Sequence, residues 1–179
     1  MPKMPLFDAT GMILPELLAP NSVPSRSMTS DDLELGKAAE HLVCADLIMQ
    51  GYRAFLTDQG LPYDILVDID GNYVRVQVKA TRKPKNPQPS SRSTPGYFFN
   101  VKRAGKGGRR RYPEKAFDLL ALVAMDRQLI AYLPPEDCRR QMVAFRVPDC
   151  SYRKGGKYRE FHGSSFERAL GRYVMNVES

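Results

Sequence analysis

Two neighbouring segments of the chain alternate between apolar and polar residues, which is the pattern of half-buried β-strands. The first covers residues 62–69 (Pro-Tyr-Asp-Ile-Leu-Val-Asp-Ile), and the second covers residues 73–81 (Tyr-Val-Arg-Val-Gln-Val-Lys-Ala-Thr). The residues between them begin with Asp70-Gly71, a dipeptide that is favoured in two-residue hairpin turns. The sequence therefore predicts an antiparallel hairpin with one apolar face and one polar face.

The position of the turn decides which side chains meet on the polar face. With Asp70-Gly71 as the turn, Asp64 lies opposite Gln77; with Gly71-Asn72 as the turn, it lies opposite Lys79. Both registers gather Asp64, Gln77 and Lys79 on one face. A carboxylate, an amide oxygen and an ammonium group placed this way suit metal-assisted phosphodiester cleavage. The same trio is also compatible with the ordinary solvated face of a half-exposed hairpin.

Residues 33–49, which precede the hairpin, have the periodicity of an amphipathic helix. Ser30 or Asp31 is a suitable N-cap, and Gly51 is a suitable residue to end the helix. Glu40 borders the apolar stripe of this helix, where burial of an unpaired carboxylate would be costly. It therefore either joins a partner or a metal ion, or stays solvated at the flank. The stripe consists of Leu35, Ala39, Leu42, Val43 and Leu47.

Three later segments complete the elements expected from the residues alone. Residues 97–101 (Tyr-Phe-Phe-Asn-Val) predict a third core strand, whose aromatic side chains fit packing in the core better than stacking on bases. Residues 142–147 predict another strand. Residues 164–173 predict a closing helix.

Several short segments resemble the PD-(D/E)XK nuclease superfamily. The two branches that they resemble are the group I intron-encoded homing endonucleases and the archaeal-type Holliday junction resolvases. The likeness covers residues 31–147 and implies an α/β fold: a restriction-endonuclease-like αβββαβ core with a central mixed sheet flanked by helices. The segments that carry it are residues 36–40 (Gly-Lys-Ala-Ala-Glu), 50–52 (Gln-Gly-Tyr), 63–65 (Tyr-Asp-Ile) and 75–79 (Arg-Val-Gln-Val-Lys), with later strands at 116–124 and 129–134.

The resemblance implies an Mg²⁺-dependent DNA endonuclease, with Mn²⁺ as a possible alternative ion. Asp64 would be the main metal ligand, and Gln77 and the Val78 carbonyl would complete the ligand set. Glu40 would act directly or through a metal-bound water, and Lys79 would stabilise charge on the phosphate or orient the attacking water. The expected substrate is duplex or branched DNA, and cleavage of both strands favours a homodimer.

The sequence departs from the family pattern at two positions. Gln77 stands where the family usually has an acid, and Tyr63 separates Pro62 from Asp64. A neutral amide oxygen attracts Mg²⁺ less strongly than a carboxylate does. Some similar members also carry glutamine there, so the alternatives are an active nuclease and a catalytically inactive nucleic-acid-binding or inhibitory protein on the same scaffold. RNA as the target also stays open.

The charge of the chain is concentrated in its second part. The net charge is +7, but residues 1–72 hold 4 Lys and Arg against 11 Asp and Glu, whereas the remainder holds 23 against 9. Residues 82–111 contain no acid, which predicts a phosphate-binding surface beside the hairpin rather than a merely solvated loop. The residues expected to bind nucleic acid are Lys37, Arg82, Lys83, Lys85, Arg92, Lys102, Arg103, Lys106, Arg109, Arg110 and Arg111.

Composition suggests a division into an extension and one domain. Residues 1–30 contain five prolines and predict a flexible N-terminal extension, and residues 31–179 predict the nuclease-like domain, with basic loops at 82–96 and 102–112. No signal-peptide pattern or membrane span is expected. Three widely spaced cysteines fit reduced thiols, so we expect a cytoplasmic protein, with a nucleoid, phage or mobile-element context possible.

Overall fold

The computed structural model of the protein describes most of the chain from Asp31 onward. By their contacts, residues 1–34 and residues 35–179 form two units, and the sheets and the site below belong to the second. The predicted extension at residues 1–30 lies outside the described residues. The described ranges are 31–86, 94–102, 112–113, 115–138, 142–150 and 158–177.

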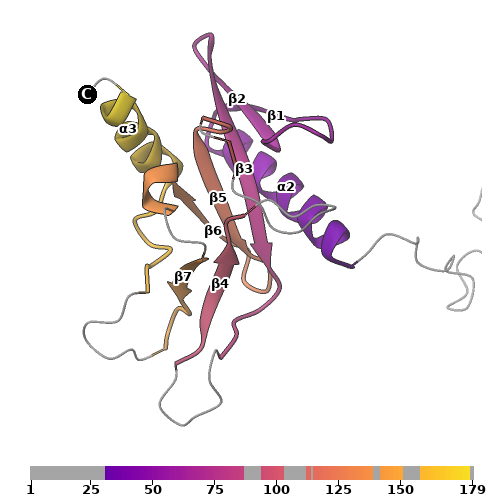
Figure 1. The fold of residues 1–179 in the computed structure, drawn as a ribbon, viewed down its shortest axis with the longest axis vertical. Coiled ribbons are helices and arrows are strands. Elements are labelled where there is room, and N and C mark those ends of the chain that lie inside the picture. Colours follow the sequence, from indigo (N-terminus) through magenta and orange to yellow (C-terminus); the bar gives the residue numbers. More distant parts are fainter. Residues whose placement is uncertain are drawn as a thin grey trace, which may run out of the picture. The chain divides into compact units, whose positions relative to one another are not determined.

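Figure 1 shows the order and placement of the elements along the chain. A first helix is followed by strands, a short 3-10 helix, one more strand and a last helix. These elements are α2 (Asp31–Met49), β1 (Arg53–Leu56), β2 (Ile65–Ile69), β3 (Asn72–Thr81), β4 (Gly96–Asn100), β5 (Leu119–Ala124), β6 (Leu129–Leu133), η1 (Pro135–Cys138), β7 (Met142–Arg146) and α3 (Phe166–Val177).

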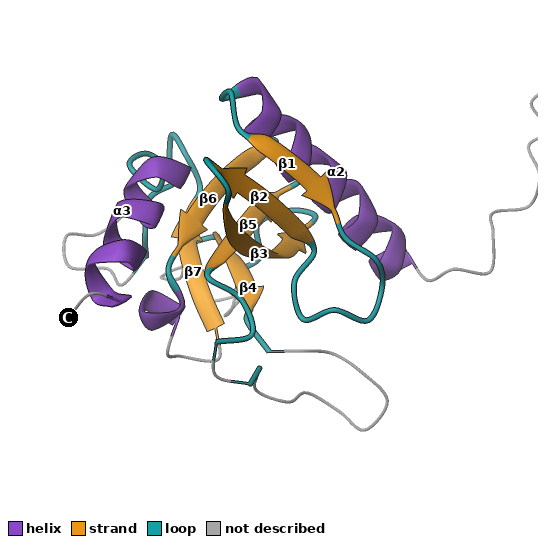
Figure 2. Cartoon of the chain, turned by 90° about the horizontal axis from the view of Figure 1, so that it is seen from above, coloured by secondary structure: helices purple, strands orange, loops and turns teal. Residues whose placement is uncertain are grey.

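A mixed five-stranded sheet forms the centre of the domain, with strand order β1-β2-β3-β5-β6. Strands β3 and β5 run parallel, and the other neighbours run antiparallel. Strands β4 and β7 form a separate two-stranded antiparallel sheet (Figure 2). The predicted α/β class, with a central mixed sheet flanked by helices, is confirmed.

The β2–β3 hairpin has the first of the two registers expected from the sequence. Ile69 pairs with Asn72, and both residues of the turn have left-handed backbone conformations, φ 52° at Asp70 and φ 84° at Gly71. Two positive φ values in succession are characteristic of the type I′ turn, which suits Asp-Gly. Counting along the ladder from this turn places Asp64 opposite Gln77.

Apolar side chains pack on both faces of the central sheet. One core cluster contains Val43 and Leu47 of α2, Phe166 of α3 and the valines of β3. The other contains Tyr97, Phe145 and other residues of the two-stranded sheet, packed on the opposite side of β5. All six residues of β5 are buried, as expected for a strand that is covered on both faces. The polar face of β3 is consequently not a solvated outer surface.

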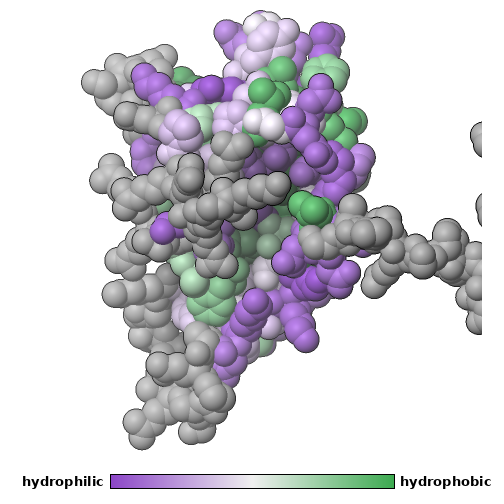
Figure 3. Space-filling view, turned by 45° about the vertical axis from the view of Figure 1, so that its right-hand side comes forward, coloured by the Kyte–Doolittle hydropathy of each residue, from purple (hydrophilic) through white to green (hydrophobic). Residues whose placement is uncertain are grey.

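The helix α2 follows the sequence prediction at its C-terminus. Gly51 has φ 94°, its N–H donates to the carbonyl of Ile48, and the N–H of Tyr52 donates to the carbonyl of Leu47. These two bonds form a Schellman motif, which satisfies carbonyls that the last helical turn leaves free. The described surface on this side of the domain is mainly hydrophilic, with isolated apolar residues (Figure 3). No helix in the described ranges combines the length and hydrophobicity needed to cross a membrane.

The predicted strand at residues 97–101 is present as β4, but it lies in the second sheet. Tyr97 and Phe99 are 0% and 1% exposed, so their assignment to the core is confirmed. Strand β1 had not been singled out from the sequence.

A buried acid joins β3, β5 and α3. Asp118, 4% exposed, accepts hydrogen bonds from the Arg75 backbone N–H (2.8 Å), from Arg75 Nε (3.0 Å) and Nη2 (2.8 Å), and from the Tyr173 hydroxyl (2.6 Å). Burial alone would raise the pKa of Asp118, but the bonds from Arg75 and Tyr173 outweigh it and hold the pKa below its usual 3.8. The ionised form is therefore the one that the fold stabilises.

Replacing this acid by its amide tests its contribution to folding. We expect Asp118→Asn to lower the free energy of unfolding at neutral pH by about 2–4 kcal/mol, because the Arg75 guanidinium loses its buried partner. A carboxyl with a depressed pKa stabilises the fold above its unfolded pKa and loses that effect as the pH falls through its folded pKa. Urea unfolding should therefore show a difference between wild type and variant that is full at pH 7 and shrinks below about pH 4. An equal difference at both pH values would contradict this assignment.

Candidate active site

Three of the residues singled out from the sequence meet where β3 passes the start of β2. The carboxylate Oδ2 of Asp64 accepts a hydrogen bond from the Val78 backbone N–H at 2.7 Å and a second one from Gln77 Nε2. The same Gln77 nitrogen also donates to the Val78 carbonyl oxygen at 3.2 Å. Gln77 is 6% exposed, so its amide lies inside the domain rather than on a wet surface. The hairpin register accounts for this meeting, because it puts Asp64 opposite Gln77.

These contacts test whether the residues present suit a divalent cation. Asp64 Oδ2 and the Val78 carbonyl oxygen both lie within hydrogen-bond reach of one nitrogen, so the two oxygens converge on one point. Gln77 brings a third oxygen, its Oε1, on the same side chain. Carboxylate, carbonyl and amide oxygens are the hard ligands that Mg²⁺ and Mn²⁺ accept. Within the described ranges, no group of three or more His, Cys, Asp or Glu side chains gathers in a metal-binding arrangement. Asp64, Gln77 and the Val78 carbonyl therefore suit one cation that is held by one carboxylate and two neutral oxygens.

The carboxylate of Asp64 is half-buried, and its electrostatic surroundings are mixed. Burial raises the pKa of Asp64 above its usual value, and the nearby charge of Glu40 raises it further. The Val78 N–H and the charges of Lys79 and Lys37 act in the opposite direction without cancelling the rise. An acid with a raised pKa is less stable in its charged form, so this position favours a cation beside it.

Glu40 lies on α2 close enough for its charge to act on Asp64. Its carboxylate pairs with Lys37 at 2.9 Å, one helical turn earlier, and the two side chains are 21% and 46% exposed. Lys37 is therefore the partner that Glu40 needs at its position beside the apolar stripe of α2. Lys37, which was expected to bind nucleic acid, therefore lies beside the acids and is joined to one of them.

Lys79 projects to the same face as Gln77 and is held by a residue that the sequence analysis did not single out. Its ammonium group lies 2.7 Å from the hydroxyl oxygen of Tyr112. The same nitrogen lies 5.2 Å from the centre of the Tyr112 ring, so it sits beyond the hydroxyl end rather than above the ring face. The ring of Tyr112 packs edge-on against Phe117 at 5.0 Å. In the sequence, Tyr112 is noticeable only as an aromatic residue directly after the basic run. Its contact with Lys79, 33 positions earlier, could not be predicted from the sequence.

The basic residues near the end of β3 are only partly within the described ranges. Arg82, Lys83 and Lys85 follow β3 directly and are exposed or partly exposed, whereas Lys102 follows β4. Lys85 and Gly96 form an antiparallel bridge with bonds of 2.8 and 3.0 Å, which closes the base of the predicted loop at 82–96. The remaining members of the expected surface lie outside the described residues; they are Arg92, Arg103, Lys106, Arg109, Arg110 and Arg111.

Comparison with a solved structure agrees with this fold. The structure is that of a bacterial homing endonuclease, I-Ssp6803I, which superposes with a TM-score of 0.58 at 16% sequence identity. The match covers 83% of this chain and 95% of the other. At this identity the likeness concerns the fold alone. No curated protein gives a significant sequence match.

A family model matches the sequence directly. The model is that of the PD-(D/E)XK endonuclease, and it matches residues 31–163. This range contains every element from α2 to β7, together with Glu40, Asp64, Gln77, Val78 and Lys79. This range is most of the chain, and the match agrees with the resemblance noted from the short motifs. The chain therefore belongs to the PD-(D/E)XK endonuclease family.

Proposed function

We propose that the protein is a metal-dependent DNA endonuclease that hydrolyses phosphodiester bonds in the manner of a homing endonuclease. Membership of an endonuclease family supports the reaction class, and the similar fold of a bacterial homing endonuclease supports the type. The observation that carries the proposal is the convergence of Asp64 Oδ2 and the Val78 carbonyl on Gln77 Nε2. A nuclease that uses few acids needs such convergence to hold a cation.

The protein's own groups divide into ligands, a fixed cation and phosphate-binding residues. Asp64, Gln77 and the Val78 carbonyl would hold Mg²⁺ or Mn²⁺, with Glu40 contributing directly or through a water molecule. When bound, such an ion polarises a phosphoryl oxygen and lowers the pKa of a bound water. Lys79, fixed by the Tyr112 hydroxyl, presents a preorganised positive charge to the phosphate in the transition state.

Basic residues near the candidate site support a DNA substrate. Arg82, Lys83 and Lys85 are exposed and come directly after β3, the strand that carries Lys79. Contacts of this kind bind the phosphate backbone without regard to sequence and weaken as salt rises. We expect a duplex substrate, with a two-fold homodimer supplying one site for each strand.

Two alternative functions predict different results with DNA. A catalytically inactive binding or inhibitory protein is favoured by Gln77, whose amide bonds the ligand oxygens without any ion. It would bind DNA without cleaving it. A Holliday junction resolvase-like nuclease would prefer four-way junctions to linear duplex. Incubation with supercoiled plasmid, linear duplex and four-way junctions, each with and without Mg²⁺, separates the three.

Removal of the main ligand or of the fixed cation should abolish cleavage while leaving DNA binding largely intact. We expect Asp64→Ala and Lys79→Ala each to reduce the single-turnover rate of Mg²⁺-dependent plasmid nicking by about 100-fold or more, because each removes charge placed for the transition state. Asp149→Ala, which removes an exposed acid that pairs with Arg127, is the matched control and should cleave as wild type does. Wild-type protein that nicks no DNA in Mg²⁺ or Mn²⁺ would contradict the proposal.

The hydroxyl of Tyr112 should affect the rate through Lys79. We expect Tyr112→Phe to keep the ring contact with Phe117 but to slow cleavage by about 10-fold, because the ammonium group loses its anchor. DNA affinity and melting temperature should change little. Tyr73→Phe, which alters an exposed tyrosine of the same strand as Lys79, serves as the control. A rate unaffected by Tyr112→Phe would show that Lys79 needs no anchor.

A further inference from the structure

The nitrogen of the Gln77 amide occupies the point on which the two ligand oxygens converge. A cation bound by Asp64 Oδ2 and the Val78 carbonyl would need this point for itself. We propose that the Gln77 amide substitutes for the cation in the metal-free protein and turns to present its Oε1 when the ion enters. This inference rests on the proposed metal-dependent function and adds a conformational role for one side chain.

The orientation of the amide follows from the charges that it faces. With Nε2 toward Asp64 and the Val78 carbonyl, two N–H bonds meet two acceptors. The opposite orientation would direct the amide oxygen at a carboxylate oxygen and a carbonyl oxygen, which repel it. Once a cation lies between them, the preference reverses, because the cation attracts Oε1 and repels the N–H groups. Each orientation therefore belongs to one state of the site.

The same geometry gives a physical reason for glutamine at this position. A glutamate in place of Gln77 would put a second carboxylate against Asp64 in a buried site, with Glu40 already nearby. Without metal, these like charges would repel one another and destabilise the fold. Glutamine removes that repulsion and adds hydrogen bonds, at the cost of weaker attraction for the ion. The metal-free protein is thereby stabilised by a group that must move when the ion binds.

Nuclear magnetic resonance of the full chain tests the movement directly. The side-chain NH₂ signals of Gln77, assigned by their loss in Gln77→Met, should shift and exchange faster with solvent on saturation with Mg²⁺. Gln50, an exposed residue directly after α2, is the internal control. Its Nε2 donates to the Asp46 carboxylate at 2.7 Å, and its signals should stay in place. Calorimetry on wild type and Asp64→Asn establishes in parallel that the ion binds at this site.

Melting in EDTA supplies a second readout that needs no metal. We expect Gln77→Met to lower the melting temperature by a few degrees, because Asp64 and the Val78 carbonyl lose a buried donor, whereas Gln50→Met should leave it nearly unchanged. Mg²⁺ bound at Asp64 with the Gln77 signals unmoved would overturn this inference alone. Absence of any Mg²⁺ or Mn²⁺ binding would overturn it together with the proposed metal dependence.

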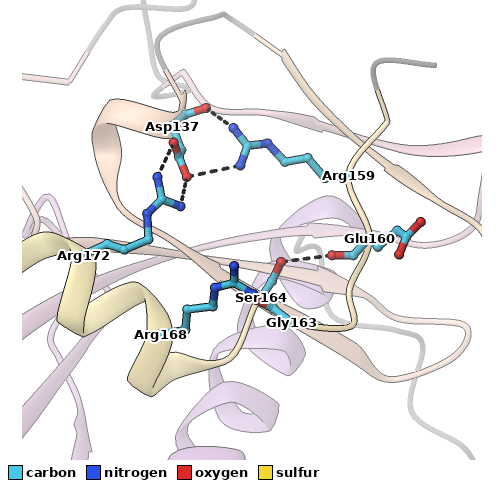
Figure 4. Close-up of polar contacts among 7 residues, drawn as sticks. All are labelled: Asp137, Arg159, Glu160, Gly163, Ser164, Arg168 and Arg172. Carbon is cyan, nitrogen blue, oxygen red and sulfur yellow. Dashed lines mark hydrogen bonds and ion pairs between the residues drawn. The ribbon is translucent and has the colours of Figure 1, made fainter. Parts of the chain in front are cut away.

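A second candidate site is a pocket beside β6, the edge strand of the central sheet that lies opposite β1. The pocket has a volume of about 380 Å³ and lies between β6 and the beginning of α3. Its lining includes Arg159, Arg168 and Arg172, whose side chains come from the segment before α3 and from α3 itself. Figure 4 shows Arg159 and Arg172 directed at Asp137, and Arg168 beside Gly163 and Ser164. Strand β5 separates β6 from β3 in the sheet, so the pocket is distinct from the site at Asp64.

The arginines of this pocket exceed the acids that oppose them. Asp137 accepts bonds from Arg172 Nη1 and Nη2 at 2.6 and 2.9 Å and from Arg159 Nη1 at 3.2 Å. Glu136 also acts on the charge of Arg172. Glu160 lines the pocket too, but its carboxylate is engaged by Arg146 at 2.9 Å. Two acids thus stand against three guanidinium groups, and the pocket keeps a positive charge.

Of the three arginines, Arg168 is the one that no carboxylate of the described residues pairs with. Its Nη1 donates to the backbone carbonyl of Gly163 at 3.2 Å. Gly163 has φ 80°, and a Cβ there would lie 3.0 Å from the same Nη1, so glycine lets the arginine close over the loop. Arg168 and Arg172 also lie one turn apart on α3, where like charges repel one another. Arg168 thus adds to the pocket lining a guanidinium group whose hydrogen-bond partner is a backbone carbonyl and not an acid.

We infer that this pocket binds a phosphate oxyanion. Guanidinium groups are the donors best matched to phosphate oxygens, and three arginines line this pocket. The phosphate can belong to a backbone of DNA that extends beyond the cleavage site, or to a free phosphate or mononucleotide. Binding of a DNA backbone rests on the proposed nuclease function, whereas binding of a free phosphate or mononucleotide does not.

Arg168→Gln tests the pocket without disturbing the Asp137 bridge, and Arg127→Gln, which removes an exposed arginine paired with Asp149, is the control of equal charge. In EDTA, we expect Arg168→Gln to weaken binding of a long duplex and to reduce the slope of log affinity against log salt by about 0.9 more than the control does. Melting in inorganic phosphate or adenosine monophosphate supplies the second arm: wild type and Arg127→Gln should be stabilised, and Arg168→Gln should not.

The outcomes separate the two sources. A change in both arms assigns the pocket to the DNA backbone, and a change only with the small anions assigns it to a free phosphate ligand. Equal behaviour of Arg168→Gln and Arg127→Gln in both arms would overturn the inference. Because the small-anion arm involves no DNA, it gives a result even if the protein proves not to be a nuclease.

Discussion

The register of the β2–β3 hairpin is the constraint on which the site depends. Two left-handed residues, Asp70 and Gly71, make a turn of two residues, and the pairing that follows puts Asp64 opposite Gln77. A shift of one residue would turn the whole strand over, moving Asp64 to the apolar face and Ile65 to the polar one. Burial of Ile65, Val67 and the facing valines excludes such a shift, and the turn at Asp70 and Gly71 sets the register that assembles the oxygens.

Burial then changes what these polar groups can do. Parallel pairing with β5 brings the two-stranded sheet and its aromatic core over the polar face of β3, so Gln77 loses contact with water. In that setting each polar atom needs a partner, and Gln77, Asp64 and Val78 supply one another. A site that is satisfied without metal can fold before it meets an ion. An ion bound as proposed would compete with this internal hydrogen bond, which would weaken its binding.

The sequence was sufficient for the elements with strong local signals. Alternation and the Asp-Gly turn predicted the hairpin and narrowed its register to two alternatives, and helical periodicity with Gly51 predicted α2. Contacts that depend on distant packing were not readable. The placement of β4 in a second sheet depends on pairing with β7 more than forty residues later, and the anchoring of Lys79 by Tyr112 spans 33 residues. The bonds of Asp118 to Arg75 and Tyr173 arise from the same kind of long-range meeting.

The central claim is that a single divalent ion is held by Asp64, Gln77 and the Val78 carbonyl. Anomalous scattering from crystals grown with Mn²⁺ tests it most directly, because the ion is located independently of any assumption about its ligands. The account predicts one strong peak about 2.0–2.3 Å from an Asp64 oxygen and from the Val78 carbonyl oxygen, with the Gln77 amide oxygen facing it. A peak at another set of residues, or none in crystals saturated with Mn²⁺, would contradict it.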